Sequence, residues 1–472
     1  MDEQELIHKV RTQAAARKLW ERGDTIIVAV SGGPDSTALL DLLHRIQGDE
    51  GLRLVAAHVD HGFRGEESAA EAVAVRRFAK NLGIPCESVF IDLPVYIEET
   101  GMNSQAAARE KRYDFLLRTA RKYGARRIAL GHHADDQAET VLMRLLRGTG
   151  TTGLAGIAFS RDEKNVQLIR PLLRITKTAL VQYCKARGLT VTDDSSNHKR
   201  DYTRNRIRLD LMPVLRSFNP QLSDSLVRLS DIAAEEDDWM ESEAKEAFRR
   251  LAVAEADGYR LERGALLGLH VALQRRLIKL ILIHMGMEKE TTPFDTVESM
   301  REAAREDAAS TWRIDAGGGI RFAREYEVLR FWRGGVHAPG AYRYELEAAV
   351  NQLYIAEAGI ALSLTLEQAA GTTKPAGRCE AMFDAERLEF PLVARNRLPG
   401  DRMRVLGLNG TKKVQDMFVD ERIPPSRRGL MPLLADASGD IIWIPGVRRG
   451  EAAQVTEVTR QVLRIRARFD DA

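Results

Sequence analysis

The loop Ser31-Gly32-Gly33-Pro34-Asp35-Ser36 constrains this chain more than any other stretch. It follows an apolar, β-rich run, Thr25–Val30, and precedes a helical pattern over Thr37–Leu43. Adjacent glycines let a backbone turn tightly and approach a ligand closely. The first turn of the following helix presents free N–H groups and the positive end of the helix dipole. Strand, glycine turn and helix in this order predict an anion site suited to a phosphate or pyrophosphate.

The loop differs from two common phosphate-binding motifs. A Walker loop has four residues between its glycines and then Gly-Lys-Ser/Thr, and a dinucleotide fingerprint reads Gly-x-Gly-x-x-Gly. The loop matches neither pattern. An ordinary tight turn is the plain alternative, but Asp35, Ser36 and both flanking elements favour a nucleotide site.

Strand and helix patterns alternate over the N-terminal part of the chain. Such alternation predicts right-handed βαβ units and a parallel sheet covered on both faces. In such sheets ligands bind outside the carboxyl ends of the strands. Three polar stretches follow predicted strands and should meet at that edge: Ser31–Ser36, Asp60-His61 and Gly131–Thr140.

The third polar stretch opens a helix and carries His132, His133, Asp135, Asp136 and Glu139. Acidic residues in a first helical turn suit the dipole, so simple capping is one interpretation. Three carboxylates and two histidines beside a phosphate site are also typical of a Mg²⁺ or ammonium site, because Mg²⁺ bridges carboxylates to substrate phosphates. We expect the cluster to be functional as a whole.

Length and composition predict a multidomain globular protein. The chain has 472 residues, 44% of them apolar, and a net charge of +2, which fits two or three domains. Its three cysteines are far apart in sequence, which favours a reducing cytoplasm over a disulfide scaffold or zinc knuckle. The acidic N-terminus lacks a signal-peptide pattern, and no apolar run reaches the ~20 residues of a membrane span.

Charge and turn patterns divide the rest of the chain. Residues 170–216 are rich in Lys and Arg and include Asp193–Asn197 and Tyr202. Arginine forks and aromatic rings suit RNA phosphates and bases, although a solvated basic surface is an equal alternative. We expect a catalytic domain at 1–216, a helical docking domain at 217–335, a linker region at 336–379 that includes Gly371–Gly377, and a small α/β domain at 380–472.

Several of these motifs resemble one family in combination. Ser31–Ser36, His58–Arg64, Arg112-Tyr113 and His132–Thr140 look like the N-terminal domain of tRNA(Ile)-lysidine synthetases, a branch of the PP-loop ATP pyrophosphatases. Asn205–Arg208 resembles the stretch that follows this domain in the same family, and the final domain of the family is resembled at Gly400–Arg402, Lys412–Asp416 and Trp443–Arg448. The resemblance spans nearly the whole chain and is weakest over 230–380. Phe63, where the family often has leucine, is a mild departure.

The resemblance implies a fold and a reaction. The fold would be α/β, with a Rossmann-like parallel sheet domain, a helix-rich domain and a small C-terminal α/β domain. ATP, with Mg²⁺, would adenylate O2 of the wobble cytidine in a tRNA(Ile) with a CAU anticodon. Free L-lysine would then attack C2 and release AMP, so that the codon read changes from AUG to AUA. A homodimer stays open as the oligomeric state.

The resemblance also assigns residues to roles. We expect Asp35, His132, His133, Asp136 and Glu139 to be catalytic, with Asp136 and Glu139 holding the lysine ammonium and either histidine, or an acid, as the base. Asp35 and Asp135 are candidates for binding the metal ion. Residues expected to bind ATP are Ser31, Gly32, Gly33, Pro34, Asp35, Ser36, His58 and Asp60. Residues expected to bind tRNA are Arg112, Arg204, Asn205, Arg208, Arg402, Lys412 and Lys413.

Two alternatives stay open at this point. Another PP-loop enzyme, such as a tRNA 2-thiolating enzyme, would share the loop, but it usually needs a cysteine pair that this sequence lacks. A non-catalytic RNA-binding protein with a retained nucleotide fold is the second alternative, and the intact loop and acidic cluster disfavour it.

Overall fold

The computed structural model describes residues 2–62, 66–192, 203–288, 292–305, 311–334, 340–348, 351–369, 374–407 and 410–470. The chain forms two compact units, Met1–Glu241 and Ser242–Ala472. The boundary falls within one helix, α11 (Leu222–Leu251). In the described ranges no helix has the length and apolar character needed to cross a membrane.

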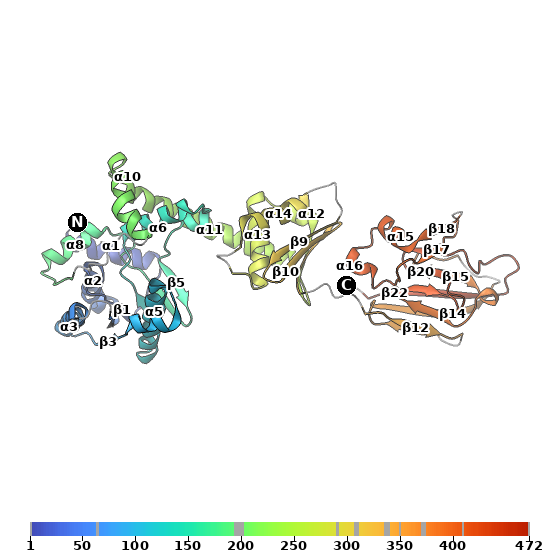
Figure 1. Cartoon of the computed structure of the whole chain (residues 1–472), viewed down its shortest axis with the longest axis horizontal. Coiled ribbons are helices and arrows are strands. Elements are labelled where there is room, and N and C mark those ends of the chain that lie inside the picture. The colour runs from blue at the N-terminus through green and yellow to red at the C-terminus, as the bar shows by residue number, and fades with distance from the viewer. Residues whose placement is uncertain are drawn as a thin grey trace. The chain divides into compact units, whose positions relative to one another are not determined.

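A six-stranded sheet forms the centre of the first unit, in the order β3-β2-β1-β4-β6-β5 (Figure 1). All neighbouring strands run parallel except the β5–β6 hairpin. The strand order changes direction at β1: β2 and β3 are added to the sheet on one side of β1, and β4 is added on its other side. The strands are β1 (Thr25–Ala29), β2 (Arg53–Asp60), β3 (Cys86–Phe90), β4 (Arg127–Ala129), β5 (Ser160–Glu163) and β6 (Val166–Ile169).

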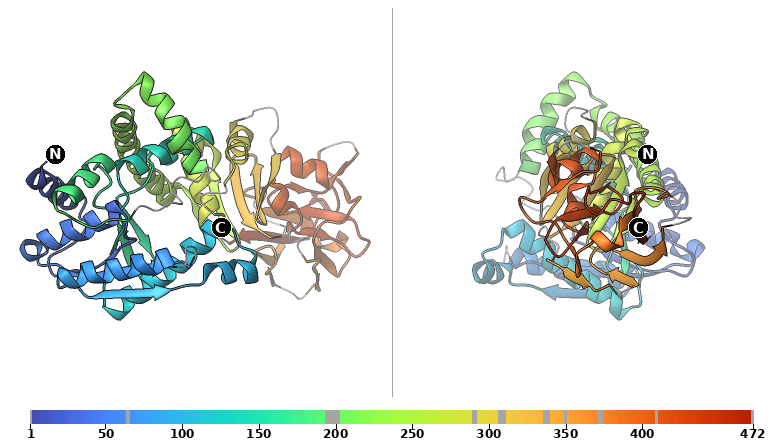
Figure 2. Two further views of the ribbon diagram at one scale, coloured as in Figure 1. Left: turned by 60° about the vertical axis from the view of Figure 1, so that its left-hand side comes forward. Right: turned by 90° about the vertical axis from the view of Figure 1, so that its right-hand side faces the viewer.

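Helices cover both faces of this sheet, because successive strand residues point to opposite sides. Ile26 and Val28 join a core with α1 (Glu3–Ala16), α2 (Pro34–Glu50), α3 (Glu66–Asn81) and α8 (Lys177–Ala186). Ile27, between them, packs with α5 (Ser104–Lys122) on the other face. The layers can be followed from two further directions in Figure 2. This arrangement confirms the predicted Rossmann-like, mostly parallel sheet.

The remaining helices of the first unit follow β3 or lie beyond β4. Leu142 of α6 packs with Ile207 and Met212 in a separate small core. The helices are α4 (Leu93–Thr100), α6 (Ala134–Leu146), α7 (Thr151–Leu154), α9 (Thr203–Arg206), a π-helical turn (Ile207–Leu211) and α10 (Met212–Phe218).

The second unit begins with helices packed on a five-stranded antiparallel sheet, ordered β7-β8-β11-β10-β9. Phe322 and Phe331 are fully buried in its core and meet edge to face. Its elements are β7 (Val253–Glu255), β8 (Gly258–Glu262), α12 (Arg263–Leu267), α13 (Val271–His284), α14 (Phe294–Arg305), β9 (Thr311–Gly317), β10 (Ile320–Glu325) and β11 (Val328–Arg333).

The C-terminal part of the second unit contains two antiparallel sheets, ordered β12-β16-β19-β20-β21 and β13-β14-β22-β15. Both contribute side chains to one core, which includes the buried Trp443 and Phe383. Its strands are β12 (Arg343–Leu346), β13 (Gln352–Ile355), β14 (Ile360–Gln368), β15 (Glu380–Asp384), β16 (Leu392–Arg395), β19 (Leu433–Ala435), β20 (Ile441–Ile444), β21 (Arg448–Arg449) and β22 (Gln461–Phe469). A hairpin, β17 (Arg402–Arg404) and β18 (Thr411–Lys413), precedes α15 (Val414–Asp420) and α16 (Pro425–Arg428).

The structure differs from the expected domain limits in two places. The first unit extends to Glu241 rather than to 216, because Leu226 of α11 packs with the small core around α6. The segment 336–379, expected as a linker region, contains β12, β13 and β14, whose apolar residues fill the C-terminal core. Asp193–Asn197, Tyr202, Phe63, Arg64 and Gly371–Thr373 lie outside the described residues.

Candidate active site

Hydrogen bonds of its own serines stabilise the glycine loop after β1. The Ser31 backbone N–H donates to Ser36 Oγ at 3.0 Å, and the Ser36 hydroxyl donates to the Gly33 carbonyl at 3.2 Å. Gly32 has φ +94°, which strains any side-chain-bearing residue, and a Cβ there would lie 2.9 Å from Thr192 Oγ1. Gly33 caps α2 with no side chain, so the first-turn N–H groups of this helix stay available to an anion.

A cavity of about 690 Å³ opens where the loops after β1 and β4 meet. Gly131 permits the close approach, since a Cβ there would lie 3.3 Å from the backbone of Asp35 and Ser36. This is the reversal point of the strand order, where open α/β sheets bind ligands. The polar residues that line the cavity are Ser31, Asp35, Ser36, Arg112, Tyr113, His132, His133, Asp136, Lys177, Lys185, Thr192 and Arg208.

His133 connects the two loops. It caps α6, where its Nδ1 accepts the Asp136 backbone N–H at 3.3 Å and its own backbone N–H donates to Asp136 Oδ2 at 3.0 Å. Its Nε2 lies 3.5 Å from both Asp35 Oδ2 and Asp136 Oδ2. Burial lowers the pKa of His133, but the hydrogen bond to Asp35 and the nearby carboxylates outweigh burial and raise it. His133 is therefore the more readily charged of the two histidines.

His132 has the opposite environment. Burial lowers its pKa to about 4, and although Asp136 opposes this shift, Arg170 and Arg204 add to it. Its Nδ1 is buried and, among the described residues, has no hydrogen-bond partner. The ring is neutral near pH 7, so a lone pair is available to accept a proton.

His58 and Asp60, at the end of β2, do not line the cavity. The Nδ1 of His58 lies 2.9 Å from the Val30 carbonyl oxygen, and burial is the main cause that lowers the pKa of this ring. Asp60 accepts the Gly62 backbone N–H at 3.0 Å. His58 therefore supports the backbone where β1 enters the glycine loop, and Asp60 supports the turn that follows β2. Their expected contact with ATP stays a prediction.

The two expected metal ligands differ in what they can offer a cation. Asp135 is fully engaged, because Oδ1 accepts Arg216 Nη2 and Oδ2 accepts the Lys177 backbone N–H, both at 2.8 Å. Asp35 keeps Oδ1 without a hydrogen-bond partner among the described residues. Within the same ranges no group of three or more His, Cys, Asp or Glu side chains has metal-binding geometry. Asp35 fits a Mg²⁺ that takes its other ligands from phosphates and water, whereas Asp135 does not.

Asp136 and Glu139, expected to hold an ammonium, are paired with Arg204 and Arg208, which were expected to contact tRNA. Arg208 donates to Glu139 through Nε at 2.6 Å and Nη2 at 2.9 Å. Arg204 donates to Asp136 Oδ1 at 2.9 Å and to Glu139 Oε2 at 3.1 Å. These arginines are four positions apart on one helical face, and Glu139 is only 3% exposed.

The other expected tRNA-binding residue at the cavity is Arg112, which lines it beside Tyr113. Asn205 is half-buried next to Arg204 and does not line the cavity. Sequence reasoning missed Lys177 and Lys185, which line the opposite wall from α8. With Val181 they recur at every fourth position, so a helical wheel of 177–185 would have shown one cationic face.

The basic residues expected in the C-terminal domain separate into two groups. Arg402 lies opposite Lys413 in the β17–β18 hairpin, and both are exposed. Lys412 lies opposite the buried Met403 and pairs with Asp420. Successive strand residues face opposite sides, so Lys412 and Lys413 do not form one patch.

Comparisons with known proteins match both ends of this chain. Residues 4–215 match the PP-loop domain family, and residues 392–466 match the family described as TilS substrate C-terminal domain. The chain is 35% identical to the tRNA(Ile)-lysidine synthase of Bacillus subtilis over 91% of this chain and 90% of that protein. It is 36% identical to that of Bacillus cereus over 96% of this chain and 95% of that protein. It is 35% identical to the tRNA(Ile)-lysidine synthase of Geobacillus kaustophilus over 94% of this chain and 95% of that protein.

Proposed function

Because the chain belongs to the tRNA(Ile)-lysidine synthase family, whose members are ATP-using ligases, we propose that it joins free L-lysine to C2 of the wobble cytidine in a tRNA(Ile) with a CAU anticodon. The observation that carries the proposal is the single cavity that unites the glycine loop with His132, His133 and Asp136. The reaction would take place in the cytoplasm, where ATP, lysine and tRNA meet.

In the first step, O2 of the cytidine attacks the α-phosphorus of ATP and the bond to the β-phosphate oxygen breaks. Pyrophosphate leaves with that electron pair. We expect the N–H groups at the start of α2 and the Ser31 hydroxyl to stabilise this developing charge, because preorganised donors are most effective where charge appears in the transition state. Asp35 would hold Mg²⁺ against the phosphates, and the ion would neutralise part of their charge.

In the second step, the lysine ε-amine forms a bond to C2, the C2–O2 bond breaks, and AMP leaves. The amine has a reference pKa of ~10.4, so it must lose a proton before it attacks. We assign that proton to His132, whose neutral ring has an Nδ1 with no hydrogen-bond partner in the described part of the chain. His133, held between Asp35 and Asp136, would keep the two loops in register.

Asp136 and Glu139 remain our candidates for holding the ammonium group of lysine. Both carboxylates are paired with Arg204 and Arg208, so lysine must compete with two guanidinium groups. The modules of the second unit would hold the tRNA body, with Arg402 and Lys413 as exposed phosphate contacts.

The direct test incubates the full chain with ATP, radiolabelled lysine and a CAU-anticodon tRNA(Ile) transcript. We expect lysine to be incorporated into RNA with an equal amount of AMP released. Sulfur incorporation into a uridine-bearing tRNA, with no lysine transfer, would indicate 2-thiolation instead. RNA binding without any nucleotide turnover would contradict both enzymatic functions.

Two neighbouring carboxylates provide a matched pair of variants. Asp136→Asn should reduce lysine transfer by a factor of 10² or more, on the order expected for a positioned catalytic group, while tRNA binding is retained. Asp135→Asn should stay within a few-fold of the wild type, because this carboxylate does not itself line the cavity and is bonded to Arg216 and to the Lys177 backbone N–H. Near-normal turnover of Asp136→Asn would remove this residue from the mechanism.

A further inference from the structure

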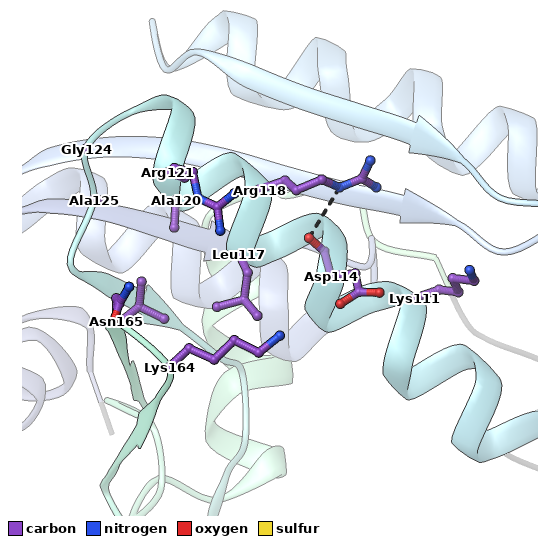
Figure 3. Close-up of a pocket in the computed structure, with 11 residues that line it drawn as sticks. Lys111, Asp114, Leu117, Arg118, Ala120, Arg121, Gly124, Ala125, Lys164 and Asn165 are labelled. Atoms are coloured by element: carbon purple, nitrogen blue, oxygen red, sulfur yellow. Dashed lines mark hydrogen bonds between the residues drawn. The ribbon is translucent and has the colours of Figure 1, made fainter.

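A second cavity, of about 650 Å³, lies away from the proposed reaction site (Figure 3). One wall is the C-terminal half of α5, and the other is the turn of the β5–β6 hairpin, which carries Lys164 and Asn165. Leu117, Ala125 and Val166 line it between these walls. The side chains of Arg118, Arg121 and Lys164 at this cavity are exposed to solvent, so they are accessible to a large ligand.

The lining of this cavity is strongly basic. Its lining contains four cations, Lys111, Arg118, Arg121 and Lys164, and one carboxylate, Asp114. The Lys111 ammonium lies 3.7 Å over the Tyr96 ring and points away from the cavity (Figure 3). In the part of the chain that the structure describes, Arg118, Arg121 and Lys164 form no ion pair, and Arg118 only donates to the backbone carbonyl of Asp114 at 3.4 Å. The neighbouring Lys122, by contrast, is paired with Glu87 at 2.7 Å. Uncompensated cations around a concave surface favour an anionic partner.

Lys164 occupies a backbone position that disfavours lysine. Its φ is +55°, in the left-handed region that glycine and asparagine adopt at lower cost. The hairpin turn could therefore form more easily with either of those residues. A cation held at such a position is consistent with a role in binding, rather than in folding of the turn.

The position of this cavity limits the kind of partner. Gly124 and Ala125 lie just before β4, separated from it by Arg126, and Lys164 and Asn165 directly precede β6, so the cavity lies at the amino ends of these strands. The reaction cavity lies at their carboxyl ends. Strands of this length place the two edges on the order of 10 Å apart before the loops are added. A free nucleotide in one cavity does not reach the other, whereas an RNA stem continuous with a bound loop can extend along the unit.

We infer that this basic cavity is a docking site for the phosphate backbone of the RNA substrate, outside the reaction site. The RNA's identity as a tRNA rests on the proposed function, but the docking chemistry requires only a polyanionic backbone with regularly spaced phosphates. Arg118, Arg121 and Lys164 contact phosphates, and the site positions the RNA without reading its sequence.

The test compares two double variants of the full chain. Arg118→Gln/Arg121→Gln removes two cations from the cavity. Arg77→Gln/Lys80→Gln removes two exposed cations from α3, on the other face of the sheet. We expect the cavity variant to bind the tRNA transcript about tenfold more weakly than the wild type. The slope of log K against log salt should become shallower by between 1 and 2, because each lost phosphate contact contributes roughly 0.9 to its magnitude. The α3 variant should match the wild type, and equal behaviour of the two variants would overturn the inference.

Lys164→Gly separates binding from folding. The change removes a cation and relieves the left-handed strain, so we expect an unchanged or higher melting temperature together with weaker tRNA binding. Unaltered tRNA affinity in this variant would contradict the inference. If ATP or pyrophosphate alone, titrated into the wild type, shifted amide signals of Arg118 and Arg121 as strongly as RNA does, the cavity would be a small-anion site instead.

Failure of this inference is distinguishable from failure of the proposed function. RNA binding is measured without turnover, so a wild-type protein that makes no lysidine can still be compared with its cavity variant. Where lysidine is made, the cavity variant should show a raised KM for tRNA with an unchanged kcat. A lowered kcat at saturating tRNA would place these arginines in catalysis and overturn the docking role.

Discussion

The charge of His132 depends on how little water reaches its ring. Burial, with help from Arg170 and Arg204, lowers its pKa to about 4, whereas the carboxylates around His133 raise the pKa of that ring. The sequence places the two histidines side by side and cannot tell them apart. Their difference follows from side-chain direction: His133 turns back onto the start of α6, and His132 does not.

This difference predicts a pH-dependent stability. The unfolded chain binds a proton on His132 near pH 6.5 while the native chain does so only near pH 4, so stability is lost as pH falls between these values. Between pH 7 and pH 5 the protonation of His132 should lower the free energy of unfolding by about 2 kcal/mol. When the pH is lowered from 7 to 5, the free energy of unfolding of His132→Gln should therefore decrease by about 2 kcal/mol less than that of the wild type. Urea titration at each pH measures this difference. Parallel pH profiles for the two proteins would show that His132 is not held neutral.

At the scale of elements, α9 and the π-helical turn after it act together with α6. Residues Thr203–Leu211 bring Arg204 and Arg208 onto Asp136 and Glu139. Sequence reasoning placed the carboxylates at the site and the arginines on RNA, because it cannot see that segments some 65 residues apart pair. The sequence gives the charge of each side chain, but the packing of the two helical segments determines that the arginines pair with these carboxylates.

The Arg208–Glu139 pair should be strongly coupled. Arg208→Ala leaves the buried Glu139 with Arg204 as its partner, and Glu139→Ala leaves Arg208 with Asp136. Each single change should therefore cost less than the 3–5 kcal/mol typical of a buried charge left wholly unpaired, and removing both partners should cost less than the two single changes together. We expect Arg208→Ala and Glu139→Ala each to destabilise the protein by a few kcal/mol, and the double variant to be less destabilised than their sum by more than about 1 kcal/mol. Additive effects in urea denaturation would show that the pair is not formed in solution.

The β17–β18 hairpin gives a second prediction at this scale. Lys412 and Lys413 are adjacent in sequence but point to opposite sides, and only Lys412 has an ion-pair partner in the described chain, Asp420. Lys413→Gln should weaken tRNA binding and lower its salt slope by about 0.9. Lys412→Gln should weaken tRNA binding, and lower its salt slope, less than Lys413→Gln does. The reverse order in a salt-dependent binding assay would contradict this assignment of faces.

At the scale of the whole molecule, prediction from sequence succeeded where local signals and topology agree. The glycine loop, the polar stretch after β4 and the parallel sheet each carry a short-range pattern, and the rule that ligands meet at carboxyl strand ends brought them together. The prediction of a linker at 336–379 was wrong because β12 pairs with β16 and β14 pairs with β22, partners that lie far along the chain. Long-range antiparallel pairing leaves little local signal.

The central claim is that the Ser31–Ser36 loop binds the pyrophosphate portion of ATP. A crystal structure of the full chain with a non-hydrolysable ATP analogue and Mg²⁺ tests it most directly. We predict that the β- and γ-phosphates contact the N–H groups at the start of α2, with the metal ion on Asp35. Phosphates bound elsewhere, for example beside Arg118 and Lys164, with the loop unliganded, would contradict the account.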